Sequence, residues 1–234
     1  MRQVVLDVET TGLEWKLGHR VIEVGCVELI GRRSTKNYFH SLVNPERLSD
    51  DGALEVHGIS NDSLQGQPKF GEIAQDLLNF ITGSELVIHN AEFDTGFLNN
   101  EFSLVGKEFG KIEDHCLVQD TLQLARKLHP GQRNSLDALC KRYGIDNSHR
   151  ALHGALLDAE ILVEVYLAMT GGQTQLLFGD KGKQDKSLDS VEPSIEHFAG
   201  QRELTVIRPN SKELKLHQAW LDLLGEGRVW PKEK

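Results

Sequence analysis

The sequence predicts an α/β fold in which a mixed sheet is flanked by helices. Two observations support this fold class. Three strand-like segments follow one another near the N-terminus, with only a short turn between the second and the third, as in an antiparallel meander. From residue 70 onward, apolar stripes at helical spacing alternate with a short strand-like run. A meander followed by such alternation gives a sheet with both antiparallel and parallel strands.

Three apolar runs define the N-terminal strands, which we place at residues 4–9, 20–30 and 36–43. A Gly-Arg-Arg turn separates the second strand from the third. Because side chains alternate along a strand, Asp7 and Glu9 point to one face of the sheet, and Leu6 and Val8 point to the other. Two carboxylates on one face repel each other, so such a pair is tolerated where a divalent cation lies between them.

The rest of the first 170 residues is expected to form helices and one more strand. An apolar stripe predicts a helix at residues 70–81, and a glycine then leads into a buried strand at 85–89. Ser135 is placed to cap a short helix that ends near Gly144. The remaining helices are expected at residues 92–104, 117–128 and 154–169.

We expect a folded domain at residues 1–172, an extended segment at 173–203 and a tail at 204–234. A chain of 234 residues exceeds the roughly 100–200 residues of one typical domain, so a compact unit with a tail is the simplest division. Residues 179–203 are polar and lack periodicity, which predicts a flexible linker. In the tail, a strand-like run at 204–207 precedes a helix at 211–224.

Composition narrows the function classes. The formal net charge is −9, and because binding to nucleic acid depends on neutralising phosphates with Lys and Arg, the chain is not expected to hold a long duplex by itself. Cys26, Cys116 and Cys140 lie far apart without the C-x-x-C spacing of a zinc site, so they are expected to be packing residues. No segment resembles a membrane span or a signal region, which predicts a cytoplasmic protein.

Short pieces scattered over more than half the chain carry a candidate metal site. They contribute Asp7 and Glu9 at a strand end, Asp94 just after the fourth strand, and His153 with Asp158 at the start of the last domain helix. Taken singly, each has an ordinary interpretation, as a solvated acidic pair or an exposed helix residue. Together they form an oxygen-rich set that suits Mg²⁺ or Mn²⁺.

These pieces resemble the motifs of the DEDD exonuclease superfamily, and a histidine five residues before the last acid is typical of its histidine branch. The resemblance extends to the family of epsilon proofreading subunits of bacterial DNA polymerase III. It rests on residues 7–12, 56–59, 89–94, 133–140 and 153–159. It covers the first 178 residues and, more loosely, the tail. It implies a ribonuclease H-like exonuclease fold with a mixed five-stranded sheet and a flexible C-terminal tail.

The resemblance implies a 3′–5′ exonuclease that removes mispaired 3′-terminal nucleotides during DNA replication. Asp7, Glu9 and Asp158 would hold one Mg²⁺ or Mn²⁺, with Asp7 bridging to a second ion. Asp94 would act partly through metal-bound water. Two ions ~4 Å apart can generate a hydroxide and stabilise the departing 3′ oxygen. His153 would be the general base, because a neutral imidazole can take a proton near physiological pH.

Substrate contacts are also implied by the resemblance. The residues that would hold the single-stranded 3′ end are Asp7, Glu9, Thr10, Thr11, His57 and Asp158. His57 resembles a residue that lines the nucleotide pocket of the family, and its alternative interpretation is a loop histidine that caps the following helix. Residues 133–140 have no role we can assign beyond helix capping and core packing.

Two partner contacts are implied outside the folded domain. The residues that resemble the peptide by which polymerase subunits bind the sliding clamp (beta) are Gln173, Leu176 and Phe178. The tail residues expected to bind the catalytic (alpha) subunit of polymerase III are Leu216, Trp220, Leu223 and Leu224. The alternative for this apolar tail is folding back on the domain. Whether a third, theta-like subunit binds is left open.

Three functions therefore compete. The first is a DNA proofreader within a replicase. The second is a freestanding exonuclease for RNA or small oligonucleotides, which would need neither a clamp peptide nor an apolar tail. The third is a non-catalytic adaptor between clamp and polymerase, which could lose its acidic residues, whereas this chain has all four and the histidine.

Overall fold

The computed structural model describes residues 1–148, 152–171 and 209–223. The chain divides into two units, Met1–Leu177 and Phe178–Lys234, which are described separately. Several predictions lie outside the described residues: the clamp-binding peptide with Gln173, Leu176 and Phe178, the linker, the strand at 204–207, and Leu224.

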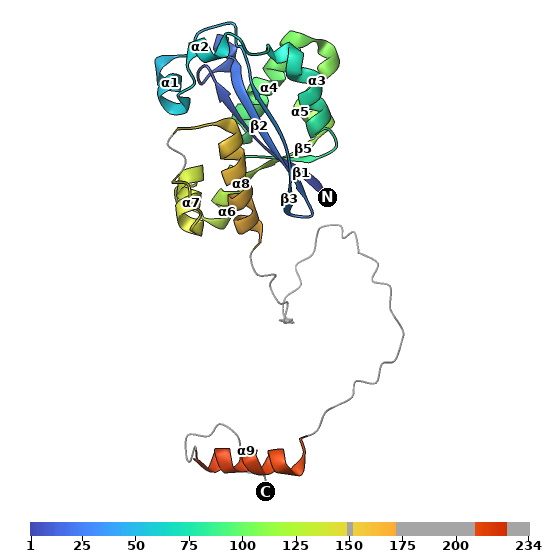
Figure 1. The fold of residues 1–234 in the computed structure, drawn as a ribbon, viewed down its shortest axis with the longest axis vertical. Coiled ribbons are helices and arrows are strands. Elements are labelled where there is room, and N and C mark those ends of the chain that lie inside the picture. Colours follow the sequence, from blue (N-terminus) through green and yellow to red (C-terminus); the bar gives the residue numbers. More distant parts are fainter. Residues whose placement is uncertain (149–151, 172–208, 224–234) are drawn as a thin grey trace, which may run out of the picture. The chain divides into compact units, whose positions relative to one another are not determined.

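A mixed five-stranded sheet forms the centre of the first unit (Figure 1). Its strands are β1 Arg2–Thr10, β2 Val21–Ile30, β3 Arg33–Leu42, β4 Glu85–Ile88 and β5 Leu117–Asp120. Their order in space is β3-β2-β1-β4-β5. The first three strands pair antiparallel, whereas β4 runs parallel to β1 and β5 runs parallel to β4. The predicted mixed five-stranded sheet is therefore confirmed, with β1 at its centre.

Helices cover both faces of the sheet and divide the core in two (Figure 1). They are α3 Phe70–Ile81 and α4 Ala91–Val105 on one face, and α6 Thr121–Leu128, α7 Leu136–Tyr143 and α8 Ala155–Thr170 on the other. Leu6 and Val8 of β1 pack in the cluster with α3 and α4, while Val5 packs in the cluster with α8. By alternation, Asp7 and Glu9 share the α8 side with Val5.

Residues 117–128, predicted as one helix, form a strand followed by a helix. The first four residues are β5, which pairs with β4, and α6 follows. Asp120 caps α6, because its Oδ1 accepts hydrogen bonds from the backbone N–H groups of Leu122 and Gln123 at 2.7 and 3.1 Å. The single-helix prediction was wrong because so short an apolar run does not distinguish strand from helix by periodicity. The capping aspartate marks the true boundary.

Short helices join the elements that the sequence predicted. They are η1 Trp15–Leu17, α1 Asp51–His57, α2 Asn61–Leu64, η2 Lys107–Phe109 and α5 Ile112–His115. Helices of one or two turns contain too few apolar repeats to be recognised, so none was predicted. The short helix α7 was predicted correctly: the Ser135 hydroxyl accepts from the Ala138 N–H at 3.3 Å, and Gly144 ends the helix with a φ of 67°.

All three cysteines are buried and none forms a disulfide, as expected of packing residues. Burial raises the pKa of the Cys116 thiol to about 11, and it raises the pKa of Cys26 as well. Both thiols are therefore held in the neutral form, which suits a place in the core.

The second unit contains α9, Ser211–Leu223, which confirms the predicted helix up to its last described residue. Asn210 caps it, because its Oδ1 accepts from the backbone N–H groups of Lys212 and Glu213 at 2.9 and 3.0 Å. None of its side chains is buried, and Trp220 is 61% exposed. Over the described parts of the chain, no helix combines the length and apolarity needed to cross a membrane.

Candidate active site

The first acidic pair lies where β1 extends beyond its neighbour. β4 pairs with β1 only from Gln3 to Val5, whereas β2 accompanies β1 as far as Thr10. The backbone of β1 beyond Val5 is therefore free of strand pairing on the β4 side. Asp94, in the first turn of α4, uses this position: its Oδ1 accepts a hydrogen bond from the Val8 N–H at 3.1 Å. The third predicted acid is thus fixed beside the strand that carries the first two.

Asp94 is almost completely buried, with 3% of its surface exposed. Burial raises its pKa to about 8, and the charge of Asp120 acts in the same direction, while the hydrogen bond from Val8 opposes the shift. A carboxyl group placed where its charge is disfavoured is stabilised by a nearby cation. The environment of Asp94 therefore fits a metal site.

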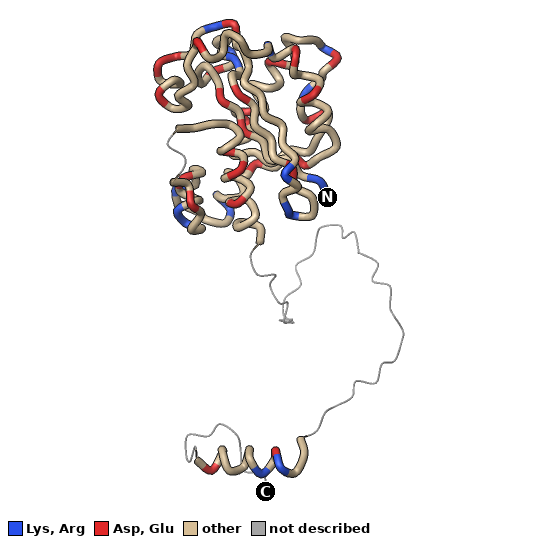
Figure 2. Tube along the Cα trace, viewed as in Figure 1, with Lys and Arg blue, Asp and Glu red and all other residues tan. Residues whose placement is uncertain are grey.

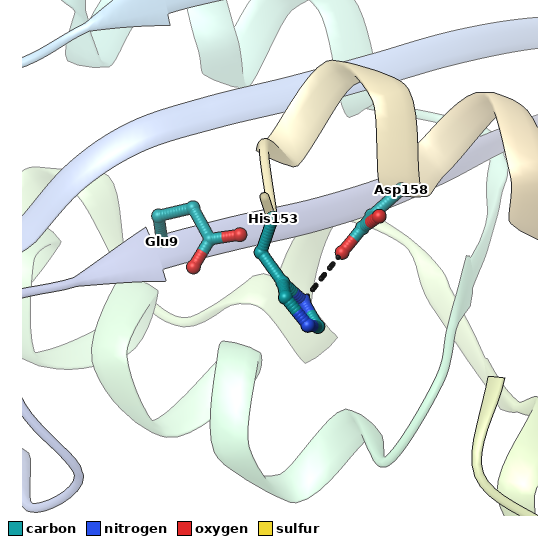
Figure 3. A group of neighbouring side chains, drawn as sticks. All are labelled: Glu9, His153 and Asp158. Atoms are coloured by element: carbon teal, nitrogen blue, oxygen red, sulfur yellow. Dashed lines mark hydrogen bonds and ion pairs between the residues drawn. The ribbon is translucent and has the colours of Figure 1, made fainter. Parts of the chain in front are cut away.

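Glu9, His153 and Asp158 form a compact group on the α8 side of the sheet (Figure 3). One ligand atom from each lies within 4.8 Å of the other two. Glu9 comes from the end of β1, Asp158 from the first turn of α8, and His153 from the segment just before α8. Glu9 and Asp158 are buried and His153 is partly exposed. Two carboxylates and an imidazole at this spacing are a donor set that fits a divalent cation.

A hydrogen bond of 3.0 Å joins His153 Nδ1 to Asp158 Oδ2. An ionised carboxylate only accepts, so the proton of this bond belongs to Nδ1. A neutral imidazole protonated at Nδ1 presents Nε2 as its acceptor atom. Asp158 thereby sets both the orientation and the tautomer of the ring, as carboxylates commonly do for functional histidines.

The exonuclease family model matches residues 4–166 of the chain. DNA polymerase III subunit epsilon of Escherichia coli K12 is 49% identical over 228 residues, which cover 95% of this chain and 93% of that protein. The subunit of the same name from Haemophilus influenzae Rd is 45% identical over 247 residues, covering 99% and 95%. The chain belongs to the DNA polymerase III epsilon family.

Membership in the epsilon family makes this chain a 3′–5′ exonuclease with a proofreading function, a hydrolase that acts on DNA in association with DNA polymerase III. Of the three functions that the sequence allowed, the proofreader is confirmed. Exonucleases of this superfamily depend on metal ions, and the group of Glu9, His153 and Asp158 is one that could hold such an ion.

Solved structures confirm the fold. Exonuclease X in complex with 5′ overhanging duplex DNA superimposes with a TM-score of 0.54 at 24% identity, covering 73% of this chain and 94% of that one. The zinc-bound complex of E. coli exonuclease I with single-stranded DNA gives 0.63 at 18% identity, covering 74% and 41%. At these identities the likeness establishes an exonuclease fold and nothing about individual residues.

Thr10 and Thr11, which the epsilon resemblance implies as substrate contacts, both have engaged hydroxyl groups. The Thr10 hydroxyl donates to the carbonyl oxygen of Gly12 at 2.6 Å. The Thr11 hydroxyl accepts from the Arg20 N–H at 3.0 Å and is also 3.1 Å from His19 Nδ1. These bonds shape the loop that follows β1, and the substrate contacts of both threonines stay predictions.

His57 ends α1 and is 4% exposed, so the alternative interpretation as a loop histidine was wrong. Its Nδ1 accepts a hydrogen bond from the Ile59 N–H at 2.9 Å, which leaves the ring proton on Nε2. Nε2 is buried and has no hydrogen-bond partner among the described residues. Burial lowers the pKa of His57, which keeps the ring neutral. A buried donor without a partner is rare and fits a group that meets a ligand.

Charges of both signs are interspersed over the first unit (Figure 2). Acidic residues occur on the strands, on α8 and on the other helices that flank the sheet, and Lys and Arg are scattered among them over several elements of the described residues. That the chain does not hold a long duplex by itself stays a prediction.

Two residues near the site were not anticipated from the sequence, Glu23 on β2 and His40 on β3. Glu23 is 7% exposed, and both of its carboxylate oxygens are engaged, one by His40 and one by the first residue of α8. The available signal was a charged residue inside the apolar run at 20–30, at a position that faces the same side as Glu9. A lone glutamate in a strand is ordinary, so the signal was weak.

Proposed function

We propose that the exonuclease hydrolyses the terminal phosphodiester with two divalent ions, Mg²⁺ or Mn²⁺, held by Asp7, Glu9, Asp94 and Asp158. When bound, such ions supply Lewis-acid stabilisation of the phosphate and a nucleophile at neutral pH. The observation that carries this proposal is the grouping of Glu9, His153 and Asp158 within 4.8 Å. The oxygen-rich donor set favours a hard cation over zinc.

His153 is the general base of this proposal. The bond from its Nδ1 to Asp158 directs Nε2 outward as the proton acceptor, and a hydrogen bond from its backbone N–H to the Val56 carbonyl at 3.1 Å fixes the segment against α1. One hydrogen bond thus holds the ring and another holds its backbone. A base whose orientation is set in advance loses little entropy in the reaction.

The 3′-terminal nucleotide is proposed to lie against the end of α1 and the loop after β1. His57 would donate from Nε2 to an acceptor of this nucleotide, which would satisfy a buried donor that finds no partner among the described residues. Thr10 and Thr11 belong to the loop that would meet its 3′ hydroxyl. This hydrogen bond would be favourable mainly because a buried donor without a partner costs desolvation free energy, and the bond removes that cost.

Replacing both Asp7 and Glu9 by Ala tests the metal site. We expect the double variant to fold and to release no nucleoside 5′-monophosphates from a labelled single-stranded oligonucleotide with either ion. A control with Asp62 and Asp76 replaced by Ala removes the same charge from exposed positions and should keep full activity. Wild-type activity in the folded double variant would refute the assignment, whereas loss of wild-type activity on chelation would support it.

Two partner contacts are part of the proposal. Gln173, Leu176 and Phe178 would bind the sliding clamp, and the exposed apolar residues of α9 would bind the alpha subunit. Support for the second contact comes from α9 itself, because it buries none of its side chains and presents Leu216, Trp220 and Leu223 at helical spacing. A cytoplasmic location remains a further expectation of this assignment, and the assignment leaves open whether a theta-like third subunit binds.

A further inference from the structure

Glu23 is a buried carboxylate placed directly across the strand pair from Glu9. The antiparallel register of β1 and β2 makes the two residues Cα partners. Directly opposed residues of an antiparallel pair point to the same face, where like charges destabilise the pair. With Glu9 in the catalytic group, Glu23 brings a second negative charge next to it. Such an arrangement persists only where the added charge is compensated.

The compensation comes from α8 and β3. Glu23 Oε2 accepts a hydrogen bond from the Ala155 N–H at 3.0 Å, at the first residue of α8. The N-cap residue of α8 is Gly154, which has no side chain to provide this bond. Glu23 Oε1 lies 2.7 Å from His40 Nε2 on β3. The carboxylate therefore replaces a missing cap and faces the positive end of the helix dipole.

The position of this cap matters because the catalytic residues flank it. His153 lies two residues before Ala155, and Asp158 lies in the first turn that Ala155 begins. The Asp158 N–H donates to the Gly154 carbonyl at 2.8 Å, which starts the helical hydrogen bonds at the same place. A displacement of the start of α8 would move both functional side chains relative to β1.

We propose that Glu23, held by His40, is a positioning residue that fixes the N-terminus of α8 and thereby sets His153 and Asp158 against Glu9. Glu23 is not itself in the group that could bind a metal, and both of its oxygens are engaged by protein groups. His40 restrains the carboxylate from the other side. The pair acts on the chemistry through the backbone of α8.

The test compares Glu23→Ala and Glu23→Gln in the full chain. Glu23→Ala removes the cap, and we expect kcat on a short single-stranded oligonucleotide to fall roughly 10- to 100-fold with little change in KM, as for a small misplacement of catalytic groups. Glu23→Gln keeps an oxygen acceptor for the Ala155 N–H and should recover most of kcat. His40→Ala keeps the Glu23 carboxylate that caps α8 and removes the imidazole that holds this carboxylate. Its kcat should lie between the kcat of wild type and that of Glu23→Ala.

Glu28→Ala is the matched control. Glu28 lies on the same strand with 8% of its surface exposed, and it pairs with Arg2 and not with α8. The Glu28→Ala protein should lose stability and retain kcat.

A second readout is amide hydrogen exchange over residues 155–158, which should become faster in Glu23→Ala and not in Glu28→Ala. If the folded Glu23→Ala protein keeps wild-type kcat, or if Glu28→Ala loses kcat equally, the proposal is wrong. If Glu23→Ala does not fold, the Glu23→Gln variant decides. A folded Glu23→Gln protein whose kcat is far below that of wild type, while its amide hydrogen exchange over residues 155–158 is unchanged, would overturn the proposal.

Discussion

His153 and Asp158 are five residues apart in sequence, and they meet because a helix begins between them. In the proposed mechanism, the bond between Nδ1 and Oδ2 would give Asp158 a second task besides holding a cation, which is to orient the base. Removing the imidazole should therefore affect the chemical step and leave the carboxylates in place.

We expect His153→Ala to lower kcat by about 10²–10⁴-fold at neutral pH, because general-base catalysis contributes about that much. Binding of a single-stranded oligonucleotide should change little. Single-turnover hydrolysis together with a binding titration separates the two quantities. His115→Ala, which removes a histidine from α5 outside the site, serves as the control. Wild-type turnover in His153→Ala would exclude this residue as the base.

Glu28 illustrates a carboxylate that stabilises the fold without taking part in the site. Its pKa is lowered, chiefly by the hydrogen bond from Arg2 at 2.6 Å and then by that from Thr35 at 2.8 Å. A carboxyl whose pKa is lower in the folded state stabilises the protein above its unfolded pKa of roughly 4.3, and the contribution is lost as the pH falls through the folded value.

Glu28→Gln should therefore reduce the free energy of unfolding by about 1 kcal/mol at pH 7. The difference from wild type should shrink as the pH is lowered from about 5 toward 3, because the wild-type carboxylate is then protonated too. Urea unfolding of both proteins at several pH values measures this difference in the free energy of unfolding. A difference that grows toward acid pH would contradict the assignment.

At the level of single residues, the sequence singled out candidates for the chemistry but not the residues that support them. The four acids and His153 were singled out because their types and order match a metal-dependent motif, and their individual roles stay predictions. Glu23 and His40 could not, since their role depends on a helix that starts more than a hundred residues later. The burial of His57 Nε2 without a partner in the described part of the chain is likewise visible only in three dimensions.

The approach of α8 to the sheet depends on one glycine. Gly25 of β2 is the Cα partner of Asp7, and a Cβ at this position would overlap with the backbone of Ala155 and Leu156. Any larger residue must push the start of α8 away from the strand that carries Asp7. The sheet and the helix are therefore close enough to share a site only because residue 25 lacks a side chain.

Gly25→Ala should destabilise the protein by about 1–3 kcal/mol or more, as overpacking does in a well-packed core, and should also lower kcat. Gly52→Ala is the control, because a Cβ there meets nothing within 4 Å and Gly52 lies in α1, where alanine is favoured by roughly 0.5–1 kcal/mol. Thermal unfolding and oligonucleotide hydrolysis report the two effects. A Gly25→Ala protein as stable and active as wild type would show that α8 can shift without cost.

Long elements were predictable from periodicity, whereas short ones were predictable only where cap or turn residues marked them, as for α7 and β4. The helices α3, α4 and α8 have enough apolar repeats to define them within about one residue of the expected bounds. The strand β5 and the helix α1 are too short for that. Both matter for the site, because α1 carries His57 and β5 ends in Asp120, whose charge reaches Asp94.

At the scale of the whole chain, the catalytic unit and α9 are described as separate units, and each carries a different expected task. The residues proposed to be catalytic all belong to the first unit. The helix α9 has a capped N-terminus, yet it buries none of its side chains. A helix whose apolar side chains are exposed in the described part of the chain is stabilised most by binding a partner surface.

The contacts with clamp and polymerase should therefore be separable from each other and from catalysis. A chain ending at Phe178 should hydrolyse single strands normally and bind the clamp, and it should fail to co-elute with the alpha subunit in size-exclusion chromatography. Replacing Gln173, Leu176 and Phe178 by Ala in the full chain should have the opposite effect, with clamp binding lost and the alpha complex kept.

Within α9, Trp220→Ala should weaken binding to the alpha subunit by roughly 30-fold, because truncating a central aromatic anchor costs about 2 kcal/mol. Gln218→Ala is the matched control: it lies two positions away on the helix, about 160° around from Trp220, and should leave affinity unchanged. Calorimetry with the full chain gives both values. Equal losses of affinity in the two variants would mean that binding needs the folded helix and not the Trp220 side chain in particular. Co-elution of the chain ending at Phe178 would instead place the main polymerase contact on the catalytic unit, and the apolar face of α9 would then need another partner.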